Sequence, residues 1–87
     1  MFEDFDIRWV VALPAEAKPL IQHLNMRRVR KNSPFKIYKD SRETNWLIIS
    51  GVGQVNMAAA TTALQHQSES PSWAIWVNVG IAGGNIG

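Results

Sequence analysis

Two short apolar runs that end in glycine loops decide the fold of this chain. They are Leu47–Asn56, with the sequence LIISGVGQVN, and Trp76–Gly84, with the sequence WVNVGIAGG. In an open α/β sheet, small ligands bind just outside the carboxyl ends of the strands. Glycine at such a position lets the backbone approach a ligand closely and adopt a positive φ angle. Two such loops in one small chain predict the floor of a nucleoside-sized pocket.

The composition is that of a single folded domain. The chain has 87 residues, of which 46% are hydrophobic and 18% are charged, and this excludes a disordered protein. It contains no cysteine, so disulfides, thiolate nucleophiles and cysteine metal sites are excluded. The N-terminus lacks the order of a signal peptide, and no apolar run approaches the roughly 18 residues that a membrane span needs. We therefore expect a cytoplasmic protein with no membrane partner.

The charges do not indicate a nucleic-acid or metal site. The formal net charge is +2, and most of the basic residues lie between Arg27 and Arg42. That stretch also carries Asp40 and is followed directly by Glu43, so the solvated face of a β-ribbon is a better interpretation than a nucleic-acid patch. The two histidines have no second ligand at metal-binding spacing. We predict no metal and no cofactor.

Hydrophobic patterns predict the element order β-α-β-β-β-α-β. The second helix is rich in alanine, and the last eight residues carry no signal of regular structure. A domain seldom ends on a glycine loop just past a central strand, so the chain is expected to be incomplete. The expected strands are residues 7–13, 26–31, 35–40, 46–50 and 73–79, and the expected helices are residues 15–24 and 54–67.

Two local features allow both a functional and a structural interpretation. The loop Gly51–Asn56 lacks the third glycine of a dinucleotide fingerprint and the Gly-Lys-Ser/Thr of a P-loop. It is either a ligand loop at a helix N-terminus or a tight turn between strand and helix, and the local pattern favours the turn. Glu16 is either a general acid or base, or a glutamate favoured by the helix dipole in the first turn. The local pattern again favours the structural role.

Three segments together resemble the nucleoside phosphorylase and nucleosidase superfamily. They are Val10–Ala17, Ser50–Ala59 and Val77–Gly84, and in this order and spacing they cover nearly the whole chain. The nucleosidase branch, which hydrolyses methylthioadenosine, S-adenosylhomocysteine or futalosine, matches best. The resemblance implies an α/β fold, a three-layer α/β/α domain with a mixed central sheet. Residues 1–87 would form one domain that is the N-terminal part of a longer one.

The resemblance also implies roles for single residues. Glu16 matches the acid that activates the attacking water, and Ser50 and Gly51 match the floor near the ribose. Ala82 and Gly83 match backbone that lines the base and ribose pocket, and Ile81 stands where the family often has serine. The family's later glutamate, which holds the ribose hydroxyls, and its later aspartate, which protonates the purine, have no counterpart here. We therefore expect N-ribosyl hydrolysis of a purine-type nucleoside as the function class, and no activity from this chain alone.

Two other functions are consistent with the sequence. A purine nucleoside phosphorylase is the first, but Leu13–Glu16 and Leu47–Ser50 contain no cation to hold phosphate, which favours water as the acceptor. The second is a truncated or domain-swapped module that only binds a ligand or assembles. The expected partner is a small-molecule nucleoside. Four tryptophans and the alanine-rich helix also predict a homo-oligomer, a dimer or higher.

Overall fold

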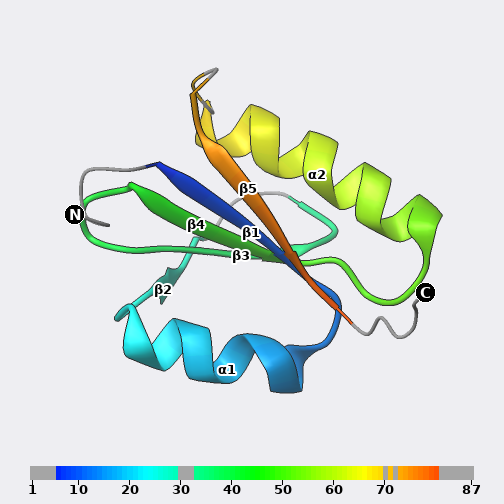
Figure 1. Ribbon diagram of the computed structural model, residues 1–87, viewed down its shortest axis with the longest axis horizontal. Coiled ribbons are helices and arrows are strands. Elements are labelled where there is room, and N and C mark those ends of the chain that lie inside the picture. The colour runs from blue at the N-terminus through cyan, green and yellow to red at the C-terminus, as the bar shows by residue number, and fades with distance from the viewer. Residues whose placement is uncertain (1–5, 30–32, 70, 72, 81–87) are drawn as a thin grey trace.

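A single mixed sheet of five strands carries one helix on each face (Figure 1). The computed structural model describes residues 6–29, 33–69, 71 and 73–80. The predicted order of elements and the three-layer α/β/α arrangement are confirmed. The elements are β1 (Ile7–Val11), α1 (Pro14–His23), β2 (Arg27–Arg28), β3 (Lys36–Lys39), β4 (Asn45–Ile49), α2 (Gln54–Ser68) and β5 (Ile75–Val79).

The parallel part of the sheet brings three strand ends to one edge. The strand order is β2-β3-β4-β1-β5, and β1 runs parallel to both of its neighbours. Val11, the last residue of β1, is in register with Ile49 at the end of β4 and with Val79 at the end of β5. The loops that follow these strands therefore start side by side. The other pairings, β2 with β3 and β3 with β4, are antiparallel.

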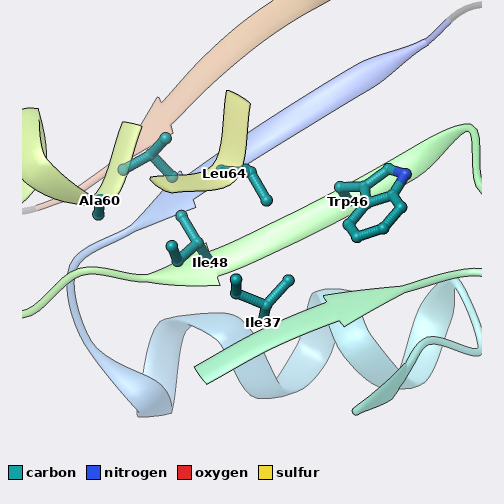
Figure 2. Close-up of a cluster of buried hydrophobic side chains, with 6 residues drawn as sticks. Ile37, Trp46, Ile48, Ala60 and Leu64 are labelled. Carbon is teal, nitrogen blue, oxygen red and sulfur yellow. The ribbon is translucent and has the colours of Figure 1, made fainter. Parts of the chain in front are cut away.

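Two apolar clusters hold the helices on the sheet. Successive residues of a strand point to opposite faces, so Val10 faces α2 and Val11 faces α1. The cluster under α2, drawn in Figure 2, contains Val10, Ile37, Trp46, Ile48, Ala60 and Leu64. The cluster under α1 contains Val11, Ala17, Met26 and Leu47. Covering both faces of β1 and β4 explains why these strands are nearly continuous apolar runs.

Three of the predicted strands differ from the observed ones by two or more residues at one end. The first strand ends at Val11 instead of residue 13, because Pro14 already begins α1. The predicted strand 26–31 is reduced to Arg27–Arg28, and residues 30–32 lie outside the described part of the chain. The last strand begins at Ile75, so Trp73 lies ahead of it, with 73% of its surface exposed.

Candidate functional site

The carboxyl edge of the parallel strands is extended by backbone hydrogen bonds into the loops. Ser50 donates its N–H to the carbonyl of Val11 at 2.8 Å, and Gly51 donates to Ala12 at 3.0 Å. Ala12 in turn donates to the carbonyl of Val79 at 3.0 Å. The loops after β1, β4 and β5 are thus joined into one surface at the place where open α/β sheets bind ligands.

The loop between β4 and α2 needs its glycines. Gly51 has a φ of 82° and Gly53 a φ of 115°, in a region that other residues adopt only with strain. Gly53 caps α2, and its carbonyl accepts the N–H of Met57 at 3.0 Å. Asn56 donates from its side-chain amide to the carbonyl of Val52 at 3.0 Å and so pins the loop. The free N–H groups at the start of α2 face this loop and favour hydroxyls or anions.

Two hollows lie over this surface. One has a volume of about 380 Å³ and is lined by residues that include Ala12, Gly53, Asn78 and Gly80. The other has a volume of about 310 Å³ and lies between Pro14, Lys36 and the Ser50–Gly51 turn. Both volumes are near the lower limit for small-molecule sites, which is about 300 Å³.

A larger cavity lies at the other end of the parallel strands, where β1 and β4 begin; we call this end of the sheet the amino edge. Its volume is about 570 Å³, and it is lined by the last turn of α1 and by the turn between β3 and β4. It is far from the glycine loops and next to the amino ends of β1 and β4. We place the candidate site at the carboxyl edge, because the loops and free helix N–H groups converge there.

Glu16 occupies the first turn of α1 and is half-buried. Its Oε1 accepts the backbone N–H of Leu13 at 3.3 Å, so the carboxylate caps the first turn of α1. The other described carboxylates lie toward the opposite edge, in the segment before β1, in the β3–β4 turn and after α2. Within the described residues, Glu16 is therefore the single carboxylate at the carboxyl edge, but it is not among the residues that line either hollow.

Ser50 and Gly51, two of the predicted site residues, line the second hollow. Ser50 is only 5% exposed, and its hydroxyl donates to the carbonyl of Gly51 at 2.8 Å. Its hydroxyl thus holds the turn in shape and leaves only oxygen lone pairs for a ligand. The three remaining predicted site residues, Ile81, Ala82 and Gly83, lie outside the described residues.

Lys36 lines the second hollow and is a candidate site residue that the sequence analysis did not select. The antiparallel register pairs Lys36, at the start of β3, with Ile49, at the end of β4. This pairing places the positive charge of Lys36 at the carboxyl edge. Among the described residues that line the two hollows, Lys36 is the single charged one. The predicted strand pair 35–40 and 46–50 contained this signal, since the first residue of one antiparallel strand faces the last residue of the next.

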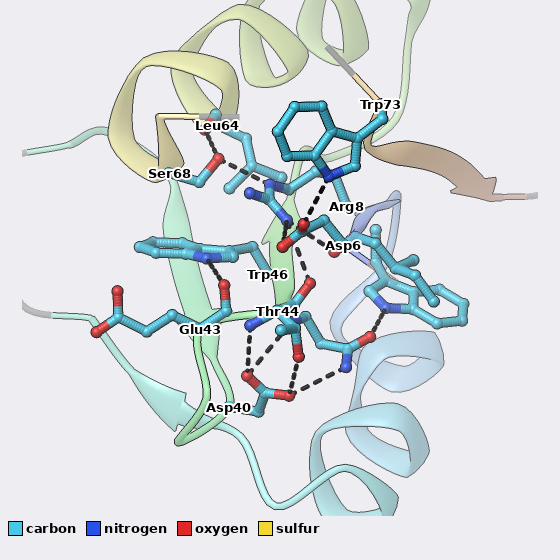
Figure 3. Close-up of polar contacts among 12 residues, drawn as sticks. Asp6, Arg8, Asp40, Glu43, Thr44, Trp46, Leu64, Ser68 and Trp73 are labelled. Atoms are coloured by element: carbon cyan, nitrogen blue, oxygen red, sulfur yellow. Dashed lines mark hydrogen bonds and ion pairs between the residues drawn. The ribbon is translucent and has the colours of Figure 1, made fainter. Parts of the chain in front are cut away.

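The amino edge of the sheet is closed by a buried polar network (Figure 3). Arg8 is 2% exposed, and its guanidinium donates to Ser68 Oγ at 2.9 Å and to the carbonyl of Thr44 at 3.2 Å. Asp6 Oδ1 lies 4.0 Å from the same guanidinium. Burial lowers the pKa of Arg8, and the charges of Asp6 and Asp40 oppose that shift. This network ties the start of β1 to the end of α2 and to the start of β4.

Asp40 organises the β3–β4 turn at the same edge. Its carboxylate accepts the backbone and side-chain donors of Thr44 and Asn45 at 3.0 to 3.3 Å. Burial alone would raise the pKa of Asp40, but the hydrogen bonds from Asn45 and Thr44 outweigh it and lower that pKa. Asn45 also accepts the indole N–H of Trp9 at 3.2 Å. The side-chain polar groups of Asp40, Thr44 and Asn45 are thus used in hydrogen bonds within the structure.

Metal chemistry has no support in the described part of the chain. Among residues 6–29, 33–69, 71 and 73–80, no three His, Asp or Glu side chains are grouped so that they could hold a metal ion. His23 and His66 are both exposed.

In the same residues, neither helix is long and apolar enough to cross a membrane.

Comparison with known proteins supports the fold. No protein-family model and no curated protein matches the sequence. Among solved structures, the chain is similar to the 5′-methylthioadenosine/S-adenosylhomocysteine nucleosidase from Neisseria meningitidis, determined in complex with methylthio-immucillin-A. The TM-score is 0.66 at 23% sequence identity, and the match covers 83% of this chain but only 31% of the nucleosidase. The resemblance seen in the three sequence motifs is thereby confirmed as a likeness of fold, and the chain has the α/β fold of part of a nucleosidase.

Proposed function

We propose that this chain supplies the nucleoside-binding edge of an N-ribosyl hydrolase that cleaves the N-glycosidic bond of a purine-type nucleoside. The observation that carries the proposal is the meeting of three parallel strand ends under two hollows, with Gly51 and Gly53 at positive φ. The similarity in fold to a nucleosidase named for 5′-methylthioadenosine supports a nucleoside as the ligand class.

In this proposal Glu16 is the general base. Its carboxylate would take a proton from the water that attacks the anomeric carbon, while the glycosidic electron pair leaves with the base. The single 3.3 Å bond from Leu13 N–H orients the side chain, and the second carboxylate oxygen has no partner among the described residues. Loss of one such group typically lowers the rate about 10² to 10⁴-fold. In a longer protein that contains this segment, we expect Glu16→Gln to lower kcat to that extent with little change in substrate affinity.

The leaving base needs a proton that the described residues do not supply. Glu16 is the single described carboxylate at this edge, and expulsion of a purine as an anion is unfavourable. We therefore propose that residues 1–87 are the N-terminal part of a longer domain. The isolated chain would bind a nucleoside without cleaving it.

Binding can be tested on the chain itself. We expect 5′-methylthioadenosine, titrated into ¹⁵N-labelled protein, to shift the amide signals of Gly51, Gly53 and Asn78. Thr44 and Asn25, which line the cavity at the amino edge, serve as internal controls. Shifts confined to Thr44 and Asn25 would reject the proposed site, and release of free base by the isolated chain would reject its proposed inactivity.

A phosphorylase is the second candidate function, because Lys36 places a positive charge beside the Ser50–Gly51 turn. A lysine next to the Ser50–Gly51 turn could offset the desolvation of a phosphate, and it supplies the cation that Leu13–Glu16 and Leu47–Ser50 lack. Inorganic phosphate should shift the Gly51 amide in the wild type but not in Lys36→Gln if the acceptor is phosphate. If water is the acceptor, phosphate should leave both spectra unchanged.

A further inference from the structure

Asn56 lies beside the turn that borders both hollows of the carboxyl edge. It is the third residue of α2 and lines the 310 Å³ hollow. Its side-chain amide donates to the carbonyl of Val52, a residue that lines the 380 Å³ hollow. A Cβ added to Gly51 would meet Asn56 Nδ2 at 3.6 Å, so the amide packs directly against the Gly51–Val52 turn.

The amide of Asn56 is held in place but only partly used. A carboxamide has two N–H donors and one oxygen with two lone pairs. One N–H goes to the carbonyl of Val52 at 3.0 Å, and no other described residue bonds to this side chain. One N–H donor and Oδ1 therefore remain for a ligand. Because the bond to Val52 already fixes the side chain, a ligand would bind it with little further loss of rotamer freedom.

The other polar side chains of the 310 Å³ hollow complement this amide. The hydroxyl of Ser50 donates to the carbonyl of Gly51, so it offers a ligand only lone pairs. Lys36 is exposed and offers only donors. Together with Asn56, the lining thus presents both donors and acceptors. Since a hydroxyl both donates and accepts, a ligand with two neighbouring hydroxyls can satisfy this set.

An anion matches the same lining less well. Phosphate mainly accepts hydrogen bonds, whereas Asn56 Oδ1 and Ser50 Oγ both present lone pairs. The amide cannot turn its whole NH₂ group toward an anion without losing the bond to Val52. Pro34 and Phe35 add apolar surface to the hollow, which raises the cost of desolvating a charge there. Neutral hydroxyls are therefore the better ligands for Asn56.

We propose that Asn56 contacts the two ribose hydroxyls of the substrate and makes this edge selective for ribonucleosides over nucleosides that lack those hydroxyls. The inference rests on the proposed function, because it assumes a nucleoside at the Gly51–Gly53 loop. Nδ2 donates to the oxygen of one hydroxyl, and the other hydroxyl donates to Oδ1. The described residues thereby hold the ribose before any residue beyond them takes part.

A pair of adenine nucleosides tests the proposal on the chain itself. Adenosine and 2′,3′-dideoxyadenosine are titrated into ¹⁵N-labelled protein, and Kd is measured from the amide shifts of Gly51 and Gly53. We expect adenosine to bind roughly 5- to 50-fold more tightly, because it alone forms the two hydrogen bonds. The side-chain NH₂ signals of Asn56 should shift with adenosine and not with the dideoxy compound.

Two outcomes would contradict this expectation in different ways. Equal affinities of the two nucleosides, with shifts at Gly51 and Gly53, would overturn the selectivity and leave the proposed function standing. No response of these amides to adenosine would overturn both.

Asn56→Ala distinguishes contact with the ligand from support of the loop. Alanine favours the helix, so the helical circular dichroism should be unchanged. If Asn56 contacts the hydroxyls, the ratio of the two affinities should fall close to one. If it only supports the loop, both affinities fall by the same factor and the ratio is kept, which would refute the proposal.

Gln65→Ala is the matched control. It makes the same change from amide to alanine at an exposed position of α2, and Gln65 lines neither hollow. We expect it to keep the wild-type ratio of affinities. A similar fall of the ratio in Gln65→Ala would show that the selectivity does not come from Asn56.

Discussion

The two ends of the parallel strands use their polar groups in opposite ways. At the amino edge, Arg8 and Asp40 form several hydrogen bonds with acceptors and donors of the protein itself. At the carboxyl edge, glycines at positive φ and the free N–H groups of α2 leave backbone groups open to a ligand. The amino edge thus supplies stability, and the carboxyl edge can remain open for binding.

The difference explains why the larger cavity at the amino edge is not the best candidate site. The amino-edge cavity borders Asp40, whose carboxylate already accepts bonds from Thr44 and Asn45. The carboxyl-edge hollows are smaller, yet they border Lys36, Asn78 and a helix N-terminus. The cavity with the greater volume is therefore not the one whose lining offers polar groups to a ligand.

Removing the buried guanidinium should have the largest effect on stability. Arg8→Met leaves the carbonyl of Thr44 and the hydroxyl of Ser68 without their buried donor, so we expect a loss of roughly 2–4 kcal/mol in the free energy of unfolding. Urea denaturation followed by circular dichroism measures it. The matched control is Ser50→Ala at the other edge, where one local hydrogen bond is lost at a cost of roughly 0.5–1.5 kcal/mol. Equal losses would contradict the division of roles between the two edges.

The glycine loop should be the next most sensitive place. Gly53 has a φ of 115°, where alanine is strained, so Gly53→Ala should cost roughly 1–3 kcal/mol. Gly80→Ala is the matched control, since its φ is not positive and an added Cβ would meet Ala12 Cβ at an ordinary 3.7 Å. That control should change the unfolding free energy by less than about 0.5 kcal/mol. If the two substitutions were equally costly, backbone conformation would not be the reason for glycine at position 53.

The effect of Asp40 should depend on pH. Asp40→Asn keeps the shape of the side chain but not its ability to accept every bond from Thr44 and Asn45, and we expect a loss of roughly 1 kcal/mol at pH 7 for this half-buried group. Because the pKa of Asp40 is lower in the folded protein than in the unfolded chain, its contribution is fully present above about pH 4 and is lost as the pH falls through the folded pKa. Urea titrations of both proteins from pH 7 to pH 2 should show the difference shrinking. A constant difference would mean that ionisation of Asp40 does not stabilise the turn.

Local patterns predicted the carboxyl edge better than the amino edge. The runs that end at Gly51 and Gly80 are contiguous in sequence, so composition alone revealed both the strands and their loops. The network of Arg8 was not predicted, because its partners Thr44 and Ser68 are 36 and 60 residues away. The sequence around Arg8 does not show which distant residues its guanidinium will contact in the folded chain.

Lys36 shows the same limit at the candidate site itself. Both strands of its hairpin were predicted. A search for a cation among the residues next to Gly51 in the sequence nevertheless misses Lys36, which lies 15 residues earlier in the chain. The cation arrives through the pairing of Lys36 with Ile49, which is a property of register. Element order could thus be predicted from local sequence, whereas the charge of the site depends on which residues the sheet places opposite one another.

Glu16→Gln should change the free energy of unfolding least of these substitutions. It also distinguishes the role of Glu16 as a general base from its role as a helix cap. Glu16→Gln keeps an oxygen that can accept the N–H of Leu13, as glutamine does in other helix caps. Only the favourable charge at the N-terminus of α1 is lost, which costs about 0.5 kcal/mol or less for a half-exposed side chain. We therefore expect nearly unchanged urea denaturation and an unchanged affinity for 5′-methylthioadenosine in the isolated chain. A stability loss above about 1 kcal/mol would show that Glu16 serves mainly to cap α1, since a proton-transferring carboxylate is needed for turnover and not for folding.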